Sequence, residues 1–253
     1  MGIDNLPFPM RVISKREPQG QHTVANISIR ARIMQDFEAR WIDKFIHIVH
    51  QHKERIGTST LKVNILDYLR ELNATYVKID FDYPYFVEKT TPASKEKCLV
   101  SHDCTYSVSV SSAEPEPITH FGIRIPTITT YPASVPEIPG GLFGQLSIVM
   151  LEVETDADIY PEDLVEIVDR HALSPVYSFL TEEDQIFLIQ KIHSDVKTSV
   201  VMVDEIKEEL AHHRAVKRFS LRCANYGMLH SYSTVIATEK SRWVPFSGYE
   251  EEL

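Results

Sequence analysis

His102 and Asp103 are adjacent residues whose side chains suit acid–base chemistry. An imidazole titrates near neutral pH, and a neighbouring carboxylate orients it and stabilises its charged form. On a strand, however, adjacent side chains point to opposite faces, and a polar turn at a strand edge is then the alternative role. We include both residues among the candidate substrate-binding residues.

Other groups of side chains contain possible metal ligands. Cys98, His102 and Cys104 form a C-x3-H-x-C pattern whose donors suit zinc, but no fourth ligand accompanies them. The remaining histidine groups are His47, His50 and His52, and His212 and His213. The group at 47–52 fits a solvated helix face, and the pair at 212–213 fits a helix end, where histidine complements the helix dipole. We therefore predict no metal site.

The composition limits the class of protein. The 253 residues are 43% hydrophobic and 25% charged, as in ordinary folded domains, and the formal net charge of −10 argues against nucleic-acid binding. No apolar stretch approaches the roughly 20 residues that span a bilayer, and the first residues do not resemble a secretory signal. Three cysteines without a CxxC pair fit a reducing compartment. We expect a cytoplasmic protein that binds neither membranes nor nucleic acid.

Hydrophobic periodicity predicts the elements that position these side chains. Residues 25–33 and 77–82 alternate apolar and polar side chains, which predicts strands with one buried face, and residues 106–110 do the same. Residues 41–49 and 61–72 carry apolar side chains at helical spacing. The predicted order of the first half is strand, helix, helix, strand, strand.

The second half repeats this type of pattern. Pro161 at a first helical position, and Thr181 with Asp184 at capping-box spacing, predict two helices. Further elements are predicted at 121–125, 146–153, 200–210, 219–223 and 232–237. Prolines and acidic residues at 112–118 interrupt the pattern, which predicts an α+β fold of two units, residues 1–115 and 116–253. The exposed sheet edge of each unit favours oligomerisation.

Three motifs together resemble the type IB GTP cyclohydrolases. Phe81-x-Tyr-Pro-Tyr-Phe-Val-x-Lys-x-x-Pro-Ala-Ser is similar to the family's Tyr-Phe-x-x-Lys-x-x-Pro-Val-Ser. Ser174-Pro-Val-Tyr follows, and Asn225-Tyr-Gly-Met-Leu-His230 is similar to the family's Asn-Phe-Glu-Ser-Ile-His. The motifs keep their order and spacing over most of the chain. The resemblance implies two tandem tunnelling-fold (T-fold) units that assemble into an oligomeric barrel, as a homodimer or homotetramer.

The zinc loop of that family is altered in this chain. The family reads roughly Val-Pro-Val-Thr-Ser-Leu-Cys-Pro-Cys-Ser-Lys and then Gly-Ala-His-Asn-Gln. This chain reads Ile125-Pro-Thr-Ile-Thr-Thr-Tyr-Pro-Ala-Ser-Val and then Gly141-Leu-Phe-Gly-Gln. Tyr131, Ala133 and Phe143 thus replace two cysteines and a histidine, and Gln185 replaces a carboxylate. Only His230 keeps a ligand type, and a lone imidazole does not make a zinc site.

Two further replacements concern the reaction and the substrate. Gly227 replaces the family's glutamate three residues before the histidine, which removes a candidate acid or base. Val200 stands where the family holds a guanine edge with a buried glutamate, although Asp195 or Asp204 could substitute for it. Loss of such paired hydrogen bonds weakens recognition strongly. The resemblance therefore implies a changed substrate as well as a missing metal.

The leading hypothesis is metal-independent acid–base chemistry on a small planar or heterocyclic metabolite: a cyclisation, dehydration or hydrolysis in a specialised biosynthetic pathway. His230, Tyr131 and Gln185 are the candidate catalytic residues, and Phe143 and Gln145 join the candidate substrate-binding residues. A pseudoenzyme that binds a metabolite or a partner protein is one alternative, and an authentic GTP cyclohydrolase with an unconventional metal site is another. No P-loop or dinucleotide fingerprint is present, so no cofactor is predicted.

Overall fold

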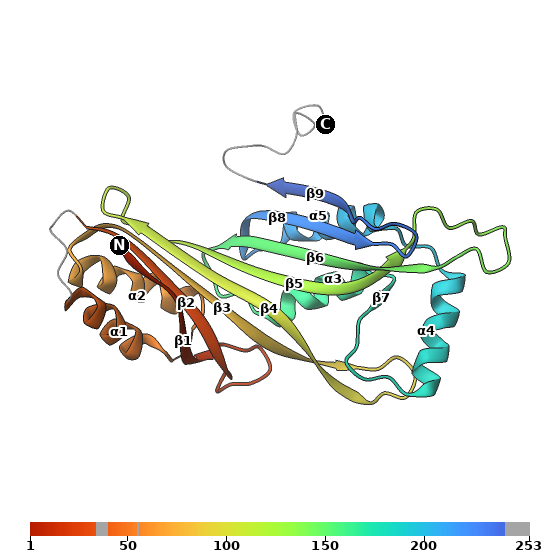
Figure 1. Cartoon of the computed structure of the whole chain (residues 1–253), viewed down its shortest axis with the longest axis horizontal. Helices are drawn as coiled ribbons and strands as arrows, with labels where there is room; N and C mark the ends of the chain where they lie inside the picture. The colour runs from red at the N-terminus through yellow and green to blue at the C-terminus, as the bar shows by residue number, and fades with distance from the viewer. Residues whose placement is uncertain (34–39, 55, 241–253) are drawn as a thin grey trace, which may run out of the picture.

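The computed structural model describes residues 1–33, 40–54 and 56–240 of the chain (Figure 1). The strands of this part are β1 (Gly2–Val12), β2 (Gln21–Ile33), β3 (Ala74–Thr90), β4 (Lys97–Ser111), β5 (Ile118–Thr130), β6 (Gly144–Thr155), β7 (Ser174–Pro175), β8 (Val216–Tyr226) and β9 (Thr234–Lys240). Its helices are α1 (Arg40–His52), α2 (Thr58–Glu71), α3 (Pro161–His171), α4 (Glu182–Ser194) and α5 (Ser199–His212).

These strands form one antiparallel sheet in the order β1-β2-β3-β4-β5-β6-β8-β9, and the two-residue β7 pairs with β5. The β3–β4 hairpin is the longest pairing and runs from Tyr76 opposite Ser111 to Thr90 opposite Lys97. β4 also pairs with β5, which lies beyond the interruption at 112–118. The sheet is therefore continuous across the predicted boundary between the two units, and that boundary stays a prediction.

The sheet has one buried face and one open face, because successive strand residues point to opposite sides. In β3 the buried residues are Ala74 and the odd-numbered ones from Val77 to Lys89, and in β4 they are the even-numbered ones from Cys98 to Val110. Side chains of α1, α2, α3 and α5 join these residues in one hydrophobic core. The helices thus cover one face and leave the other face open.

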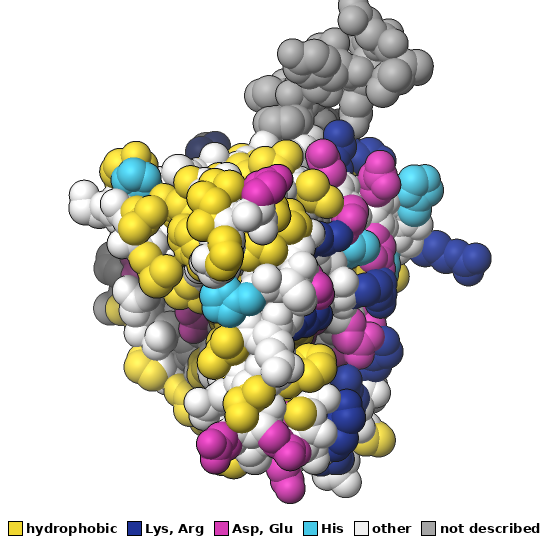
Figure 2. Space-filling view, turned by 90° about the vertical axis from the view of Figure 1, so that its right-hand side faces the viewer, with side chains coloured by type: hydrophobic (Ala, Val, Ile, Leu, Met, Phe, Trp, Pro, Cys, Tyr) yellow, Lys and Arg dark blue, Asp and Glu magenta, His cyan; other side chains and the backbone are white. Residues whose placement is uncertain are grey.

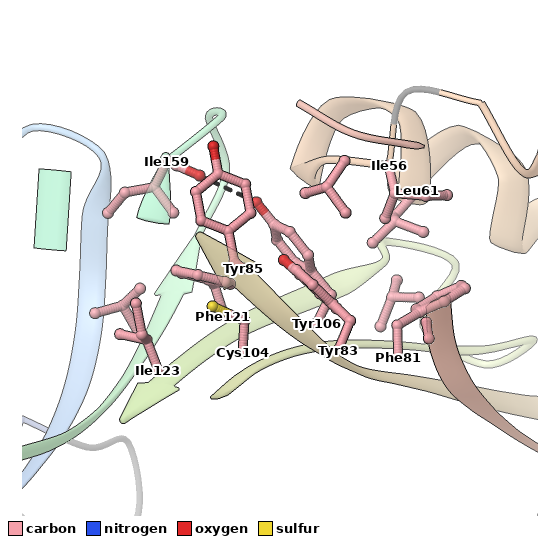
Figure 3. Close-up of a cluster of buried hydrophobic side chains, with 14 of the residues drawn as sticks. Ile56, Leu61, Phe81, Tyr83, Tyr85, Cys104, Tyr106, Phe121, Ile123 and Ile159 are labelled. Atoms are coloured by element: carbon pink, nitrogen blue, oxygen red, sulfur yellow. Dashed lines mark hydrogen bonds between the residues drawn. The ribbon is translucent and has the colours of Figure 1, made fainter. Parts of the chain in front are cut away.

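Aromatic side chains fill the core where the two halves of the chain meet (Figure 3). Tyr106 packs against Phe121 with ring centroids 4.7 Å apart, and Tyr83 stacks near it at 6.3 Å. The Tyr106 hydroxyl donates a hydrogen bond of 3.0 Å to the Ile159 carbonyl. Tyr106 belongs to β4, Phe121 to β5 and Ile159 to the segment before α3. The two halves therefore share one core.

α4 lies at one end of the molecule and begins at the predicted capping box (Figure 1). The Thr181 amide donates to Asp184 Oδ2 at 3.0 Å, and the Asp184 amide donates to the Thr181 hydroxyl at 3.3 Å. Asp184, the buried residue of this helix, also accepts the amides of Ala93 and Ser94 at 2.8 and 2.9 Å. Burial alone would raise the pKa of Asp184, but these hydrogen bonds hold it well below its usual range. The carboxylate thereby ties the start of α4 to the β3–β4 turn.

The predicted α+β class is confirmed, and so is Pro161 at the start of α3. β1 and β7 were not predicted. The predicted last strand begins two residues too early, since β9 starts at Thr234. Among the described helices, none has the length and apolar character needed to cross a membrane.

Candidate functional site

Tyr131 and Phe143 close the two ends of the loop between β5 and β6. The Tyr131 amide donates to the Phe143 carbonyl at 2.9 Å, and the two rings stack with centroids 4.9 Å apart and an angle of 20°. Ser134 adds a bond of 3.3 Å from its hydroxyl to the same carbonyl. The Tyr131 side chain is buried, at 6% exposure. Two of the predicted site residues are therefore in direct contact and form a packed aromatic pair.

Gly227, at the start of the turn between β8 and β9, lies against this pair. A Cβ atom at position 227 would be 2.4 Å from Cε2 of Tyr131, far closer than atoms in van der Waals contact. The Tyr131 ring thus occupies space that any side chain at 227 would need. The replacements at positions 131 and 227 fit together sterically, which spacing along the sequence did not reveal.

A buried chain of hydrogen bonds leads from Gln145 to the same turn. The Gln145 amide donates to the Thr129 hydroxyl at 3.2 Å, and this hydroxyl bonds that of Ser147 at 2.8 Å. Ser147 donates to Asn225 Oδ1 at 2.7 Å, and the Asn225 amide donates to Thr234 at 3.4 Å. Gln145 itself is 3% exposed. Its visible role is to support β8 and β9 from within the sheet, and its predicted contact with substrate stays a prediction.

His230 and Gln185 do not join the aromatic pair within one chain. His230 is exposed in the β8–β9 turn, where its ring stacks on Tyr232 at 4.9 Å and 16°. Gln185 is exposed in the first turn of α4, and the other end of that helix reaches the loop through His193, which bonds the Leu142 carbonyl at 2.6 Å. Gln185 and His193 are eight positions apart, or roughly 12 Å of helix. Within one protomer the described contacts therefore do not bring these residues together, and their shared catalytic role stays a prediction.

His102 and Asp103 point to opposite faces of the sheet and so do not form an acid–base pair, and their predicted contact with substrate stays a prediction. His102 is buried on the helix-covered face, and its Nδ1 lies 3.3 Å from the Arg124 carbonyl. Asp103 is exposed and lines a hollow of about 420 Å³ on the open face. Alternation along β4 separates the two side chains. Burial, with a smaller contribution from nearby Lys89, lowers the pKa of His102 to about 4.

This pKa predicts an acid-sensitive fold. An unfolded histidine titrates near 6.5, so the unfolded chain takes up a proton between pH 6.5 and about 4 that folded His102 does not. Stability should therefore fall as the pH drops through this window, by up to about 3 kcal/mol. Urea unfolding between pH 4 and pH 7 measures the slope. The slope should flatten in His102→Gln and persist in His212→Gln, whose side chain is exposed; equal slopes in both variants would contradict the assignment.

The residues that the resemblance places at the family's zinc position do not fit a zinc ion. Tyr131 and Phe143 fill the place with stacked rings, Gln185 offers an amide on a distant turn, and His230 supplies the one imidazole. Elsewhere in the described residues, no three His, Cys, Asp or Glu side chains are grouped so that they could hold a metal. The absence of a metal-binding group also applies to Cys98, His102 and Cys104, which share one face of β4. We therefore derive no step through a metal at this position.

Two buried charged groups were missed by the sequence patterns. The Lys89 ammonium pairs with both oxygens of Asp169 in α3, at 2.9 and 2.6 Å, and its side chain is 6% exposed. Burial raises the pKa of Asp169 although Lys89 opposes the shift. The other group is Glu162, described below. Lys89 lies in the first family motif, but only the fold shows that its partner is 80 residues away.

A family model described as type I GTP cyclohydrolase folE2 matches residues 1–236. The chain is similar to GTP cyclohydrolase FolE2 of Citrifermentans bemidjiense, with 29% identity over 242 residues, 96% of this chain and 89% of that protein. It is equally similar to the enzyme of that name from Geotalea uraniireducens, at 29% identity over 96% of this chain and 88% of the relative.

Solved structures support the same architecture. A uricase from Bacillus fastidious superposes with a TM-score of 0.57 over 92% of this chain and 88% of that one, at 11% identity. Identity this low speaks for the fold alone. The predicted tandem T-fold is thereby confirmed.

Proposed function

Because the chain belongs to the type I GTP cyclohydrolase folE2 family, a family of cyclohydrolase enzymes, we propose that it catalyses a cyclohydrolase-type reaction on a planar purine-like heterocycle. GTP is the first substrate to test, since the relatives carry that activity in their names. The observation that carries the finer proposal is the Tyr131–Phe143 stack against Gly227. It favours a reaction that uses no zinc at the family's position.

In this proposal the reacting groups come from the rim formed by the β5–β6 loop and the β8–β9 turn. His230 is exposed there and bears no charge partner in the described residues, so its imidazole is free to exchange protons with a ligand. Phe143 remains partly exposed and offers a face on which a planar ring can stack. Acid–base catalysis of ring hydration by His230 is the step we propose for this chain.

A homo-oligomer is part of the proposal. Figure 2 shows a broad hydrophobic area on the end of the molecule where α4, the β5–β6 loop and the β8–β9 turn lie. The exposed apolar residues of these segments include Val135, Ile138, Ile186, Phe187, Ile189, Met228 and Leu229. Contiguous exposed apolar patches in soluble proteins mark contact surfaces, and β1 and β9 are open sheet edges among the described strands. A second copy would cover α4 and add its Gln185 to a shared site, in a cytoplasmic protein.

Metal analysis together with a GTP assay tests the proposed reaction. The purified chain should carry substoichiometric zinc, manganese and iron, and its turnover of GTP or another purine-like ring, followed by ultraviolet absorbance, should survive a chelator. The second candidate, a GTP cyclohydrolase whose metal site has moved, is favoured by the names of the relatives. Stoichiometric metal with chelator-sensitive GTP turnover would establish that candidate and overturn ours.

Replacement of His230 tests its proposed role. His230→Ala should lower kcat at least about 100-fold, the usual contribution of a positioned acid or base, and leave thermal stability unchanged because the side chain is exposed. His212→Ala, an exposed histidine at the end of α5, is the matched control and should keep full activity. Turnover that survives in His230→Ala would show that another group moves the proton.

A further inference from the structure

Glu162 is a buried carboxylate whose two oxygens have different surroundings. It follows Pro161 in the first turn of α3 and is 2% exposed. Its Oε1 accepts the Ser14 hydroxyl at 2.8 Å, the Lys15 amide at 3.2 Å and the Tyr85 hydroxyl at 2.8 Å. One oxygen thus ties the β1–β2 connection, β3 and α3 together.

The other oxygen, Oε2, is buried and has no hydrogen-bond partner among the described residues. A buried polar atom without a partner is costly, and more so on a charged group, so native structures rarely leave one. Three donors already fix the orientation of the carboxylate through Oε1. The unpaired oxygen is therefore held in a fixed place with its capacity to accept a hydrogen bond unused.

Glu162 lines a pocket of about 200 Å³ between these three elements. A pocket of this volume has room for roughly six water-sized groups, because each of them takes up about 30 Å³. Phe86, which is 45% exposed, lines the pocket with aromatic surface, and Glu17 and Glu88 line it as well. None of these residues belongs to the rim assigned above to catalysis.

The charges around this pocket favour a cation. Arg16 is the one basic side chain that lines it, and its guanidinium is engaged by the Glu88 carbonyl at 2.9 Å and the Glu166 carboxylate at 3.2 Å. Glu17, Glu88 and Glu162 also line the pocket, and of these carboxylates Glu88 is paired with Lys97 at 3.0 Å. A metal ion is disfavoured, because no three acidic or other metal-binding side chains converge in the described structure.

We propose that this pocket binds a small organic cation, an amine or a guanidine, whose N–H group donates to Oε2 of Glu162. The charge of the ligand is balanced by Glu162 with Glu17, and its carbon chain lies against Phe86. Cations also bind favourably to aromatic faces. Because Glu162 joins the β1–β2 connection to α3, an occupied pocket would hold the two halves of the chain together more firmly.

Titration of the full-length protein with agmatine and with putrescine, followed by calorimetry, tests the proposal. Both probes should bind, and valeramide, an uncharged amide of similar size, should not. Glu162→Gln keeps the shape of the side chain but removes its charge, and the affinity for agmatine should fall at least about tenfold. Glu114→Gln changes the net charge equally at an exposed residue between β4 and β5, and should leave the affinity unaltered.

A second variant covers the case in which Glu162→Gln does not fold. Phe86→Ala truncates a 45% exposed side chain on the pocket, leaves the Glu162 hydrogen bonds in place and should weaken agmatine binding several-fold. No heat with millimolar agmatine on the wild-type chain would overturn the proposal. So would equal binding by Glu162→Gln, or equal binding of valeramide and agmatine.

Discussion

Replacing Lys89 with methionine is expected to destabilise the fold by about 3 kcal/mol, because it leaves a carboxylate buried without its cation. The Lys89 side chain is 6% exposed and lies 2.6 Å from Asp169 Oδ2, and the Asp169 side chain is 19% exposed. That remaining exposure keeps the expected loss near the lower end of the range for broken buried pairs. Urea unfolding measured at neutral pH gives the difference.

The matched control is Lys97→Met, which breaks an ion pair of similar length on the surface. Lys97 lies 3.0 Å from Glu88, but their side chains are 70% and 43% exposed, so its loss should cost below about 1 kcal/mol. The double variant Lys89→Met with Asp169→Leu should regain most of the stability, since it leaves no unpaired charge. If the two single lysine variants lose the same stability, solvent screens both pairs alike and the core pair has no special role.

The alternating strands could be predicted from sequence because burial on one face imposes a period of two. β3 and β4 follow that rule almost without exception, and the capping box at Thr181 has an equally local cause. β1 escaped prediction because two prolines, Pro7 and Pro9, interrupt its pattern. An edge strand tolerates proline, since only one side of its backbone pairs with a neighbour. Asn5, at φ 56°, adds a bulge that shifts the alternation further.

The candidate site was less predictable, because its contacts join residues far apart in the chain. Motif spacing indicated that Tyr131, Phe143 and Gly227 all differ from the family pattern, but not that they touch one another. Spacing also grouped Gln185 with them, although helix geometry places it about 12 Å along α4 from the residue that reaches the loop. The buried partner of Lys89 and the pocket at Glu162 have no local signal in the sequence at all.

A large loss of stability is also expected when a single methyl group is added at position 227. Gly227→Ala should destabilise the chain by about 2 kcal/mol, because its Cβ would lie 2.4 Å from the Tyr131 ring and force the ring or the turn to move. Without the ring, the same change should be neutral or slightly stabilising, since alanine restricts the unfolded chain more than glycine does. The comparison is therefore made in the Tyr131→Ala background, by denaturant unfolding of all four proteins.

A coupling of about 2 kcal/mol between the two positions would show that the Tyr131 ring is what excludes a side chain at 227. Gly144→Ala is the control, because a Cβ there meets the Ile128 and Ile192 side chains and not Tyr131, so its cost should be the same with or without the ring. Additive effects of the changes at 131 and 227 would contradict the steric account.

The steric coupling between positions 131 and 227 also limits which residues can form a zinc site here. If it holds, a glutamate cannot return to position 227 while Tyr131 is present, and a cysteine at 131 alone would leave a cavity beside Phe143. The residues needed for a zinc-dependent site would then have to be restored together. The packing of Tyr131, Phe143 and Gly227 would thereby disfavour a zinc-dependent site at this position, as the proposed metal-independent reaction requires.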